Sequence, residues 1–329
     1  MRTAAPSTQS SRRIPRTPGS VPRVGRALAV PMLAALGILA PCRAALPAAV
    51  PPHDHVVVVI MENKSYNQVR TQPYTASLIT AGASFTTSYG VLHPSQPNYI
   101  ALWAGSTLGV GSDNCPAPGG PFNVENLGHA CEAAGLTWRA YSENLPSPGA
   151  TGCSYDGSLS TGLYTRKHDP WTQFTNLNHQ NERPYPDLAA DIAASTLPNL
   201  VFIIPNNCHN THNSSTLGCG IADGDAWLAA NLPPVLTAMG PNGVLILTWD
   251  EDDNSSSNHI LTVFVGPHVS PGYVATRLIT HYTVNRTICD ALSLPNFGNA
   301  AFETPITDVW ALPIAGSPSS WGRMKALYR

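Results

Sequence analysis

The sequence predicts an α/β fold, in which a single domain is built on a doubly wound, mainly parallel sheet. Short apolar runs rich in Val, Ile and Leu recur along the chain and alternate with segments of helical periodicity. A strand in a parallel sheet is apolar throughout because helices cover both of its faces. Alternation of such strands with helices is typical of doubly wound sheets. Nothing between the elements has the composition of a linker between domains.

The predicted elements follow one another from residue 55 onwards. The apolar runs predicted as strands are residues 55–61, 136–141, 200–204, 243–249 and 260–265. The segments predicted as helices are residues 97–104, 124–134, 187–194, 223–239 and 284–292. The first of these helices has Pro97 in its first turn, where a missing N–H removes no helical hydrogen bond. Long loops rich in Gly, Pro, Ser and Asn separate several elements, and such loops commonly carry function.

The first 46 residues have the composition of an export signal. They hold seven arginines and no acidic residue, and an apolar run at 27–40 is followed by small residues. This order of basic, apolar and small segments is typical of secretory signals. The apolar run is short for a bilayer span and is interrupted by Pro31, although a retained membrane anchor is the alternative. We expect a signal segment at 1–46, one domain at 47–329, a secreted or periplasmic location, and no stable transmembrane span in the mature chain.

Without its signal segment the chain is acidic. All 20 acidic residues lie after residue 46, together with only 11 of the 18 Lys and Arg residues. Proteins that bind nucleic acid present basic patches that displace the counterions of the phosphate backbone. The composition therefore argues against a nucleic-acid partner. It does not exclude small phosphate esters, because a bound metal ion can attract them locally.

The cysteines suggest a disulfide framework. Cys42 falls in the signal segment, which leaves an even number in the predicted mature chain, as is typical of exported proteins with disulfides. Cys208 and Cys219 bracket one polar loop and form the best candidate pair. A zinc site using His209 and His212 is the alternative for this loop, but the tight CxxC pairs of structural zinc sites do not occur in the sequence. Spacing leaves the pairing of four cysteines open: Cys115, Cys131, Cys153 and Cys289.

Acidic and amide residues directly follow two of the predicted strands. Glu62 and Asn63 come after the first strand, and Asp250 and Glu251 come after the fourth. A loop rich in His and Asn follows the third strand. Parallel strands direct their carboxyl ends to one edge of the sheet, where ligands bind. We therefore expect these residues to lie close together.

Such a group of carboxylates predicts a divalent metal site. The carboxylates would repel one another unless a cation neutralised their charge. Carboxylate and carbonyl oxygens suit Mg, Ca or Mn, and an added histidine would favour Zn or Fe. The alternative is that the acids are solvated loop ends. Glu62 speaks against that alternative, because an acid directly after an apolar run is costly to bury without a partner.

Ser95 is the candidate nucleophile. It precedes the helix predicted at 97–104, so its hydroxyl lies near free backbone N–H groups that attract phosphate oxygens. A neighbouring metal ion would lower the pKa of the hydroxyl and activate it. The alternative is an ordinary N-cap, a position that favours Ser in any helix. No GxSxG motif surrounds Ser95, which argues against the triad of an α/β-hydrolase.

Histidines are the candidate proton donors. His168 lies in a predicted loop and could protonate a leaving oxygen, although a lone loop histidine is more often simply a surface residue. His212 and His259 are similar cases, and both lie near the acidic ends of strands. His281 precedes the last predicted helix and is most simply a capping-region residue, and His129 is expected on a helix face.

Taken together, these motifs resemble those of a known family. The chain resembles the phosphoesterase family that holds bacterial acid phosphatases and non-haemolytic phospholipases C, within the alkaline-phosphatase superfamily. The segments that match run in order from about residue 55 to 293: VVVVIMENKSYNQV, LHPSQPNYIALWAGST, AAGLTWRAYSENLP, YTRKHDPW, DLAADIAASTLPNLVFIIPNNCHNTHN, GDAWLAANLPPVL, VLILTWDEDD and HYTVNRTICDALSLP. The resemblance implies an alkaline-phosphatase-like fold and a phosphoesterase catalytic domain over 47–329.

The resemblance also implies roles for single residues. The implied metal ligands are Glu62, Asn63, Ser95, Asp250 and Glu251, the implied catalytic residues are Ser95, His168 and His212, and the implied phosphate-binding amide is Asn114. Asp169 replaces the Asn that is usual after the histidine of the YTRKHDPW segment. Asn210 stands where an Asp is usual, which puts a second metal in doubt. One divalent cation per site is therefore expected, either Ca, Mg, Mn or Zn.

The expected activity is hydrolysis of phosphate esters in two steps. Ser95 attacks phosphorus in line and expels the alcohol, and water then hydrolyses the phosphoserine. The expected partner is a small phosphate ester or a phospholipid head group, and an acid-phosphatase-like phosphomonoesterase is the leading hypothesis. The alternatives are a phospholipase C-type phosphodiesterase and a non-catalytic exported metal-containing binding protein.

Overall fold

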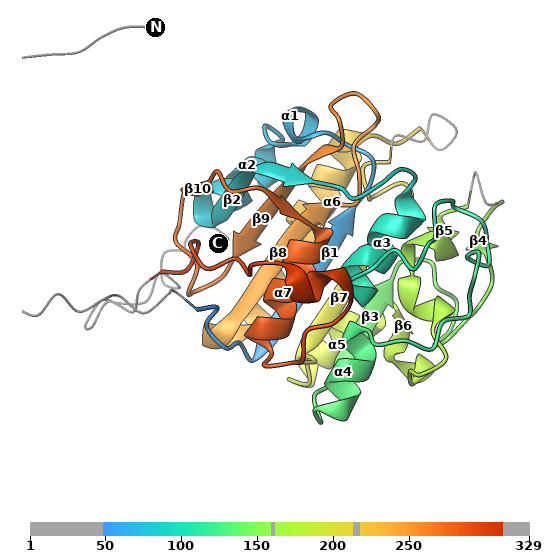
Figure 1. Ribbon diagram of the computed structural model, residues 1–329. Coiled ribbons are helices and arrows are strands. Elements are labelled where there is room, and N and C mark those ends of the chain that lie inside the picture. Colours follow the sequence, from blue (N-terminus) through green and yellow to red (C-terminus); the bar gives the residue numbers. More distant parts are fainter. Residues whose placement is uncertain (1–48, 159–161, 213–217, 312–329) are drawn as a thin grey trace, which may run out of the picture. The chain divides into compact units, whose positions relative to one another are not determined.

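The computed structural model describes residues 49–158, 162–212 and 218–311, which all belong to one compact unit. The predicted signal segment at 1–46 lies outside the described residues. The centre of the unit is a sheet of nine strands (Figure 1). These strands are β1 (His55–Met61), β2 (Ala83–Tyr89), β3 (Trp138–Ser142), β6 (Glu182–Pro184), β7 (Leu200–Ile204), β8 (Gly243–Trp249), β9 (His259–Val265), β10 (Tyr273–Ala275) and β11 (Ile279–Thr280). Strands β4 (Ser154–Tyr155) and β5 (Tyr164–Thr165) form a separate pair.

The sheet has the predicted doubly wound, mainly parallel topology. Its strand order is β10-β2-β9-β8-β1-β7-β3-β6, with β11 paired to β2. Strand β9 runs antiparallel to both of its neighbours, and the other pairings are parallel. Strand β1 therefore lies between β8 and β7, and the carboxyl ends of all three meet at one edge. The predicted fold class is confirmed.

Helices cover both faces of the sheet. The α-helices are α1 (Tyr66–Val69), α2 (Pro73–Ala81), α3 (Ser95–Ala104), α4 (Leu127–Ala133), α5 (Asp187–Ala193), α6 (Ile221–Ala238) and α7 (His281–Ala291). The 3₁₀ helices are η1 (Arg166–His168), η2 (Pro170–Gln173), η3 (His179–Asn181), η4 (Gly240–Asn242) and η5 (Gly298–Phe302). In Figure 1, α3 and α7 lie on one side of the sheet and α6 lies on the other.

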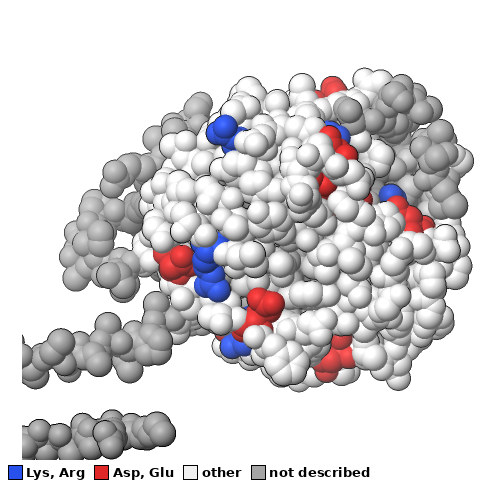
Figure 2. Space-filling model, turned by 45° about the horizontal axis from the view of Figure 1, so that its top comes forward, with Lys and Arg blue, Asp and Glu red and all other residues white. Residues whose placement is uncertain are grey.

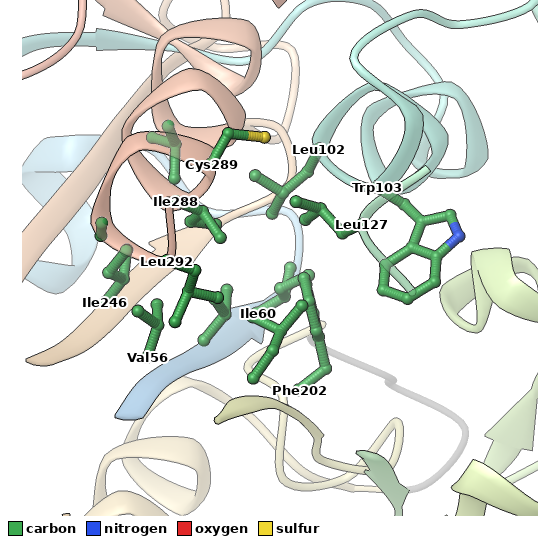
Figure 3. Close-up of a cluster of buried hydrophobic side chains, with 14 of the residues drawn as sticks. Val56, Ile60, Leu102, Trp103, Leu127, Phe202, Ile246, Ile288, Cys289 and Leu292 are labelled. Atoms are coloured by element: carbon green, nitrogen blue, oxygen red, sulfur yellow. The ribbon is translucent and has the colours of Figure 1, made fainter. Parts of the chain in front are cut away.

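The core consists of two apolar clusters, one on each face. Val56 and Ile60 of β1 pack with residues of α3, α4 and α7, as Figure 3 shows. Val57 and Val59 pack on the opposite side with residues of α2, α5 and α6. Successive side chains of a strand point to opposite faces, and both faces are covered, so β1 is apolar at every position from Val56 to Met61. This double burial explains why the sequence of β1 shows no alternation.

Several predicted boundaries need correction. The helix predicted at 97–104 begins at Ser95, so Ser95 lies in its first turn rather than before it. The last helix begins at His281 instead of 284, and the helix predicted at 124–134 spans only 127–133 because Asn126 caps it. Sequence reasoning did not predict α2 or β2. Ser and Thr make up four of the seven residues of β2, ASFTTSY, so the apolar signal of a buried strand is missing there.

Two disulfides are present in the described residues. Cys208 pairs with Cys219, as predicted, and Cys115 pairs with Cys153. Cys131 and Cys289 are buried free thiols, so the even cysteine count did not mean complete pairing. Within the described residues, no helix combines the length and hydropathy needed to cross a bilayer. On the face drawn in Figure 2, charged side chains lie singly or in small mixed groups on a mostly uncharged surface.

Candidate active site

The site lies at the carboxyl edge of the sheet, where β1, β8 and β7 end. The parallel register pairs Met61 with Trp249, so the next residues, Glu62 and Asp250, lie side by side. The loop after β7 crosses the end of β1, because Glu62 N donates to Asn210 O at 2.7 Å. Helix α3 begins at this same edge with Ser95. Strand register and helix start together bring four distant segments to one place.

Three oxygen-bearing side chains meet around the Ser95 hydroxyl. Ser95 Oγ lies 3.1 Å from Glu62 Oε2, 3.4 Å from Asn63 Oδ1 and 3.0 Å from Glu251 Oε1. We call Glu62, Asn63, Ser95 and Glu251 the oxygen cluster. Glu62, Ser95 and Glu251 are all buried. The single hydroxyl proton cannot bond to three acceptor oxygens at once. The oxygen cluster therefore has more hydrogen-bond acceptors than donors, and its carboxylates add negative charge.

The Asn63 amide shows the same shortage of donors. Its oxygen faces acceptors, and turning the amide over would place its nitrogen 3.1 Å from Glu62 Oε2 and 3.2 Å from Glu251 Oε1. The backbone of Asn63 adopts a positive φ of 48°, a conformation that Asn tolerates better than most residues. The amide therefore has two uses here: its nitrogen can bridge the carboxylates, or its oxygen can join them in binding a cation.

Asp250 supports the cluster through the backbone. Its Oδ1 accepts hydrogen bonds from Asn63 N at 3.0 Å and from Glu251 N at 2.6 Å. These bonds fix the turns that follow β1 and β8. Burial raises the pKa of Asp250 well above its usual value, and the nearby charges of Glu62 and Glu251 add to that effect. Asp250 thus orients the two loops that carry the cluster.

The carboxylates of the cluster have strongly shifted pKa values. Burial raises the pKa of Glu251 to about 8, and the charge of Glu62 acts in the same direction. Burial also acts to raise the pKa of Glu62, but His168, Lys167 and His212 outweigh it and hold that pKa well below its usual value. The two pKa shifts oppose one another because neighbouring like charges in a buried place disfavour ionisation of both groups at once.

His168 and Tyr99 complete the surroundings of Glu62. His168 Nε2 lies 3.2 Å from Glu62 Oε2, and the Tyr99 hydroxyl donates to Glu62 Oε1 at 2.5 Å. The two rings stack with their centres 5.1 Å apart. Both residues are buried. The imidazole is therefore held beside the cluster by packing as well as by its charge partner.

His212 and Asn114 are placed less directly. Burial lowers the pKa of His212. The charge of Glu62 acts to raise this pKa, and the charge of His168 acts to lower it. Its backbone N donates to Asn210 Oδ1 at 2.9 Å. Asn114 is exposed, and its backbone carbonyl accepts a hydrogen bond from Gln96 Nε2 at 3.0 Å. The structure connects Asn114 to Gln96 through the Asn114 backbone carbonyl, and the phosphate-binding role of its amide stays a prediction.

The remaining histidines have structural partners. His281 is buried in the first turn of α7, and its Nε2 contacts the Asp250 carbonyl oxygen at 2.6 Å. It therefore supports the site edge rather than serving only as a capping-region residue. His259 stacks between Tyr66 and Tyr89, and His129 lies near Glu125 on the surface of α4.

Comparison with known proteins shows the family of this chain. The profile of the Phosphoesterase family matches residues 66–295, which is more than half of the chain. This chain belongs to the phosphoesterase family. A phosphatidylinositol-3-phosphatase of Mycobacterium tuberculosis is 39% identical to this phosphoesterase over 298 residues, which cover 88% of this chain and 95% of that protein. The phosphoesterase is a phosphoric ester hydrolase, as predicted.

More distant proteins agree with this family and with the fold. An acid phosphatase of Aspergillus fumigatus is 29% identical over 252 residues, but this phosphoesterase spans only 55% of the length of that enzyme. A solved structure from Vibrio parahaemolyticus, a protein of the alkaline-phosphatase superfamily, has a TM-score of 0.58 at 10% identity. It covers 79% of this chain and 72% of its own. That likeness confirms the alkaline-phosphatase-like fold.

Sequence reasoning missed several residues that surround the oxygen cluster. His93 contacts Glu251 Oε2 through Nδ1, and its Nε2 lies 3.2 Å from Asp252 Oδ1. Tyr99 lies four residues after Ser95, the helical spacing that would have placed both on one face. Lys167 precedes His168 and pairs with Asp113. Asp113 has no sequence signal, because only the folded chain brings its loop to Ser95.

Proposed function

We propose that this protein is an exported, metal-dependent phosphomonoesterase that acts through a phosphoserine at Ser95. The observation that carries the proposal is the convergence of Glu62, Asn63 and Glu251 on the Ser95 hydroxyl within 3.4 Å. A hydroxyl among carboxylates at the start of a helix suits attack on phosphorus. The buried carboxylates require a neutralising charge, which supports a cation at this place.

The donor set fits a divalent cation. Within the described residues, no group of three or more His, Cys, Asp or Glu side chains is arranged to hold a metal. The oxygen cluster instead combines two carboxylates with an amide and a hydroxyl, a set suited to a hard cation. We infer that Glu62, Asn63, Ser95 and Glu251 would hold one such ion, with Asp250 beside them. When bound, the cation would lower the pKa of the serine hydroxyl and offset charge on the phosphoryl oxygens.

The protein's own residues supply the other requirements of the reaction. Ser95 Oγ attacks phosphorus in line. Ser95 lies at the positive end of the α3 dipole, which attracts the phosphoryl oxygens. The His168 ring stacks on Tyr99, and His168 Nδ1 lies 3.1 Å from Thr165 Oγ1. These contacts keep His168 Nε2 directed towards Glu62 of the oxygen cluster. We propose that His168 or His212 delivers the proton to the leaving alcohol. Water then hydrolyses the phosphoserine.

The names of the relatives favour phosphate monoesters as substrates. A phosphatidylinositol-3-phosphatase and an acid phosphatase both remove a phosphate group that is bound to one alcohol. We therefore propose monoesters, including phosphorylated inositol head groups, as the substrate class. Export is supported by the disulfides Cys115–Cys153 and Cys208–Cys219, because disulfides form in oxidising compartments. N-terminal sequencing of protein recovered from outside the cytoplasm would test for cleavage near residue 46.

A set of assays tests the catalytic proposal. Purified protein is given a phosphate monoester, a diester and phosphatidylcholine, with and without a chelator, alongside Ser95→Ala. We expect turnover of the monoester, its loss with chelator, its recovery when a divalent cation is returned, and a fall of at least about 1,000-fold in the alanine variant. Trapped ³²P-labelled phosphoserine should appear only with Ser95 present. Wild-type turnover by Ser95→Ala would refute the assigned nucleophile.

A further inference from the structure

A partly buried ion pair connects helix α3, which carries Ser95, to the segment that carries His168. Lys167 Nζ lies 2.7 Å from Asp113 Oδ2. The other oxygen of this carboxylate, Asp113 Oδ1, accepts a hydrogen bond from Gln96 N at 2.9 Å. Gln96 directly follows Ser95 in α3. Asp113 therefore fixes the Lys167 ammonium relative to the first turn of the helix that carries Ser95.

The positive charge of Lys167 reaches the oxygen cluster. Lys167 precedes His168 in η1, and its charge acts on both Glu62 and Glu251. Only 18% of its side chain is exposed. Burial acts to lower the pKa of Lys167, but Glu62, Asp113 and Asp250 outweigh burial and raise it. Lys167 is therefore a permanent cation, and one bond to Asp113 leaves two of its N–H donors for a ligand.

The neighbouring cationic side chains of Lys64 and Arg166 donate hydrogen bonds to other protein atoms. Lys64 Nζ donates to the Asn63 carbonyl oxygen at 2.8 Å, and burial lowers its pKa. The Arg166 guanidinium donates to Thr172 Oγ1 and to the carbonyl oxygens of Thr151 and Thr172. Lys167 is thus the strong candidate for a cation that meets a substrate phosphate at this site.

We propose that Lys167, held by Asp113, is a specificity-determining residue that makes the site prefer phosphate monoesters to diesters. This inference rests on the proposed function, phosphate-ester hydrolysis at Ser95. A phosphate monoester has two ionisable phosphoryl oxygens. A diester has only one, because a second ester bond to carbon occupies the other. A fixed ammonium binds phosphate oxygens as a point charge, and its benefit grows with the negative charge of the ligand. A diester therefore gains less from Lys167 than a monoester does.

The test compares an aryl phosphate monoester with the methyl diester of the same leaving group. For Lys167→Gln we expect kcat/KM to fall about 100-fold with the monoester and about 3-fold with the diester, because a charge-assisted hydrogen bond is lost. Lys167→Arg should restore part of the monoester rate. Asp113→Asn keeps an acceptor for Gln96 N but loses the ion pair with Lys167. It should lower the ratio of monoester kcat/KM to diester kcat/KM by about tenfold.

Lys64→Gln is the control, because Lys64 is a buried lysine next to Asn63 of the oxygen cluster whose ammonium donates to a backbone oxygen. It should change the rates with both esters by the same factor. Binding of inorganic phosphate, measured by calorimetry, gives a second readout: Lys167→Gln should weaken it at least about tenfold, and Lys64→Gln should weaken it less. Thermal unfolding of each variant checks that the fold is kept.

The outcomes separate the two proposals. If the wild-type protein hydrolyses neither ester, the proposed function is refuted. Calorimetric binding of inorganic phosphate would then be the only test of whether Lys167 binds a phosphate group. Equal loss of both activities in Lys167→Gln, with unchanged phosphate affinity, would overturn the specificity role and leave the proposed function standing. A changed ester ratio together with weaker phosphate binding would support Lys167 in this role.

Discussion

Two glutamates at the carboxyl edge of the sheet follow buried strands in the same way and have opposite surroundings. Glu62 directly follows β1, and Glu143 directly follows β3. Glu143 is satisfied by fixed N–H donors: Trp227 Nε1 at 2.9 Å, Asn206 N at 2.9 Å and His209 Nδ1 at 2.8 Å. Glu62 meets the Ser95 hydroxyl and the His168 ring, and it shares that hydroxyl with a second carboxylate.

The difference shows that an acid after a buried strand does not by itself mark a functional site. Nitrogen donors around Glu143 stabilise its charge permanently, so the carboxylate holds three elements together. Tyr99 and His168 also contact Glu62, but Glu62 shares the Ser95 hydroxyl with Glu251, so the two carboxylates together still favour a further positive charge. The type of partner atom therefore distinguishes a structural carboxylate from a candidate catalytic one.

Exchanging each glutamate for glutamine gives the largest expected contrast. Glu62→Gln should lower kcat/KM with a phosphate monoester about 1,000-fold, because the proposed cation site loses a charge. Glu143→Gln should keep kcat/KM within about threefold. Its free energy of unfolding should fall by about 1–3 kcal/mol, since an amide cannot accept hydrogen bonds on both sides. Steady-state kinetics and urea unfolding measure the two effects, and a reversed pattern would contradict the comparison.

Asp169 sharpens the comparison, because it is a buried carboxylate with few donors beside the site. Burial raises its pKa to about 7, against the opposing effect of a hydrogen bond from Ser142 Oγ at 2.8 Å. The folded protein therefore keeps a proton that the unfolded chain releases between about pH 4 and pH 7, and stability falls as the pH rises through that range.

Asp169→Asn, which restores the residue expected from the family resemblance, cannot ionise. We expect this variant to be more stable than the wild type above pH 7, by at most about 4 kcal/mol. The difference should shrink towards zero near pH 4. Urea unfolding of both proteins from pH 4 to pH 8 measures it, and a gap that does not depend on pH would show that Asp169 is not the group responsible.

Substitution of Thr211 should have the smallest effect of these changes, because Thr211 contacts only the backbone of Glu62 and not its carboxylate. Its hydroxyl donates to the Glu62 carbonyl oxygen at 2.9 Å and accepts from Trp249 Nε1 at 3.0 Å. Its φ of 74° is a strained conformation for a β-branched residue. Thr211→Val should lower the free energy of unfolding by about 1–2 kcal/mol, because it leaves the buried indole N–H without an acceptor. Thr211→Ser keeps the hydroxyl and should remain close to the wild type in the same urea unfolding experiment.

The sequence alone determined the fold class and the main strands of this protein. Strands β1, β7 and β8 have the predicted bounds, because apolar runs that are buried on both faces leave an unmistakable pattern. The same reasoning placed Glu62, Asn63, Asp250 and Glu251 at one edge, since parallel strands end together. Strand β2 escaped because its Ser and Thr residues bond within the core, as Ser88 does with Thr262 at 2.8 Å.

Only the tertiary structure decided which of these residues meet and what they meet. Asp250 was expected among the metal ligands, and the fold gives its Oδ1 to two backbone N–H groups while Glu251 reaches Ser95. Asp113 reaches α3 from a loop whose position no local pattern encodes. Hydrogen bonds between distant segments depend on distance and direction in space, and a linear sequence records neither. Periodicity therefore predicts elements, whereas the partners of a charge are set only by folding.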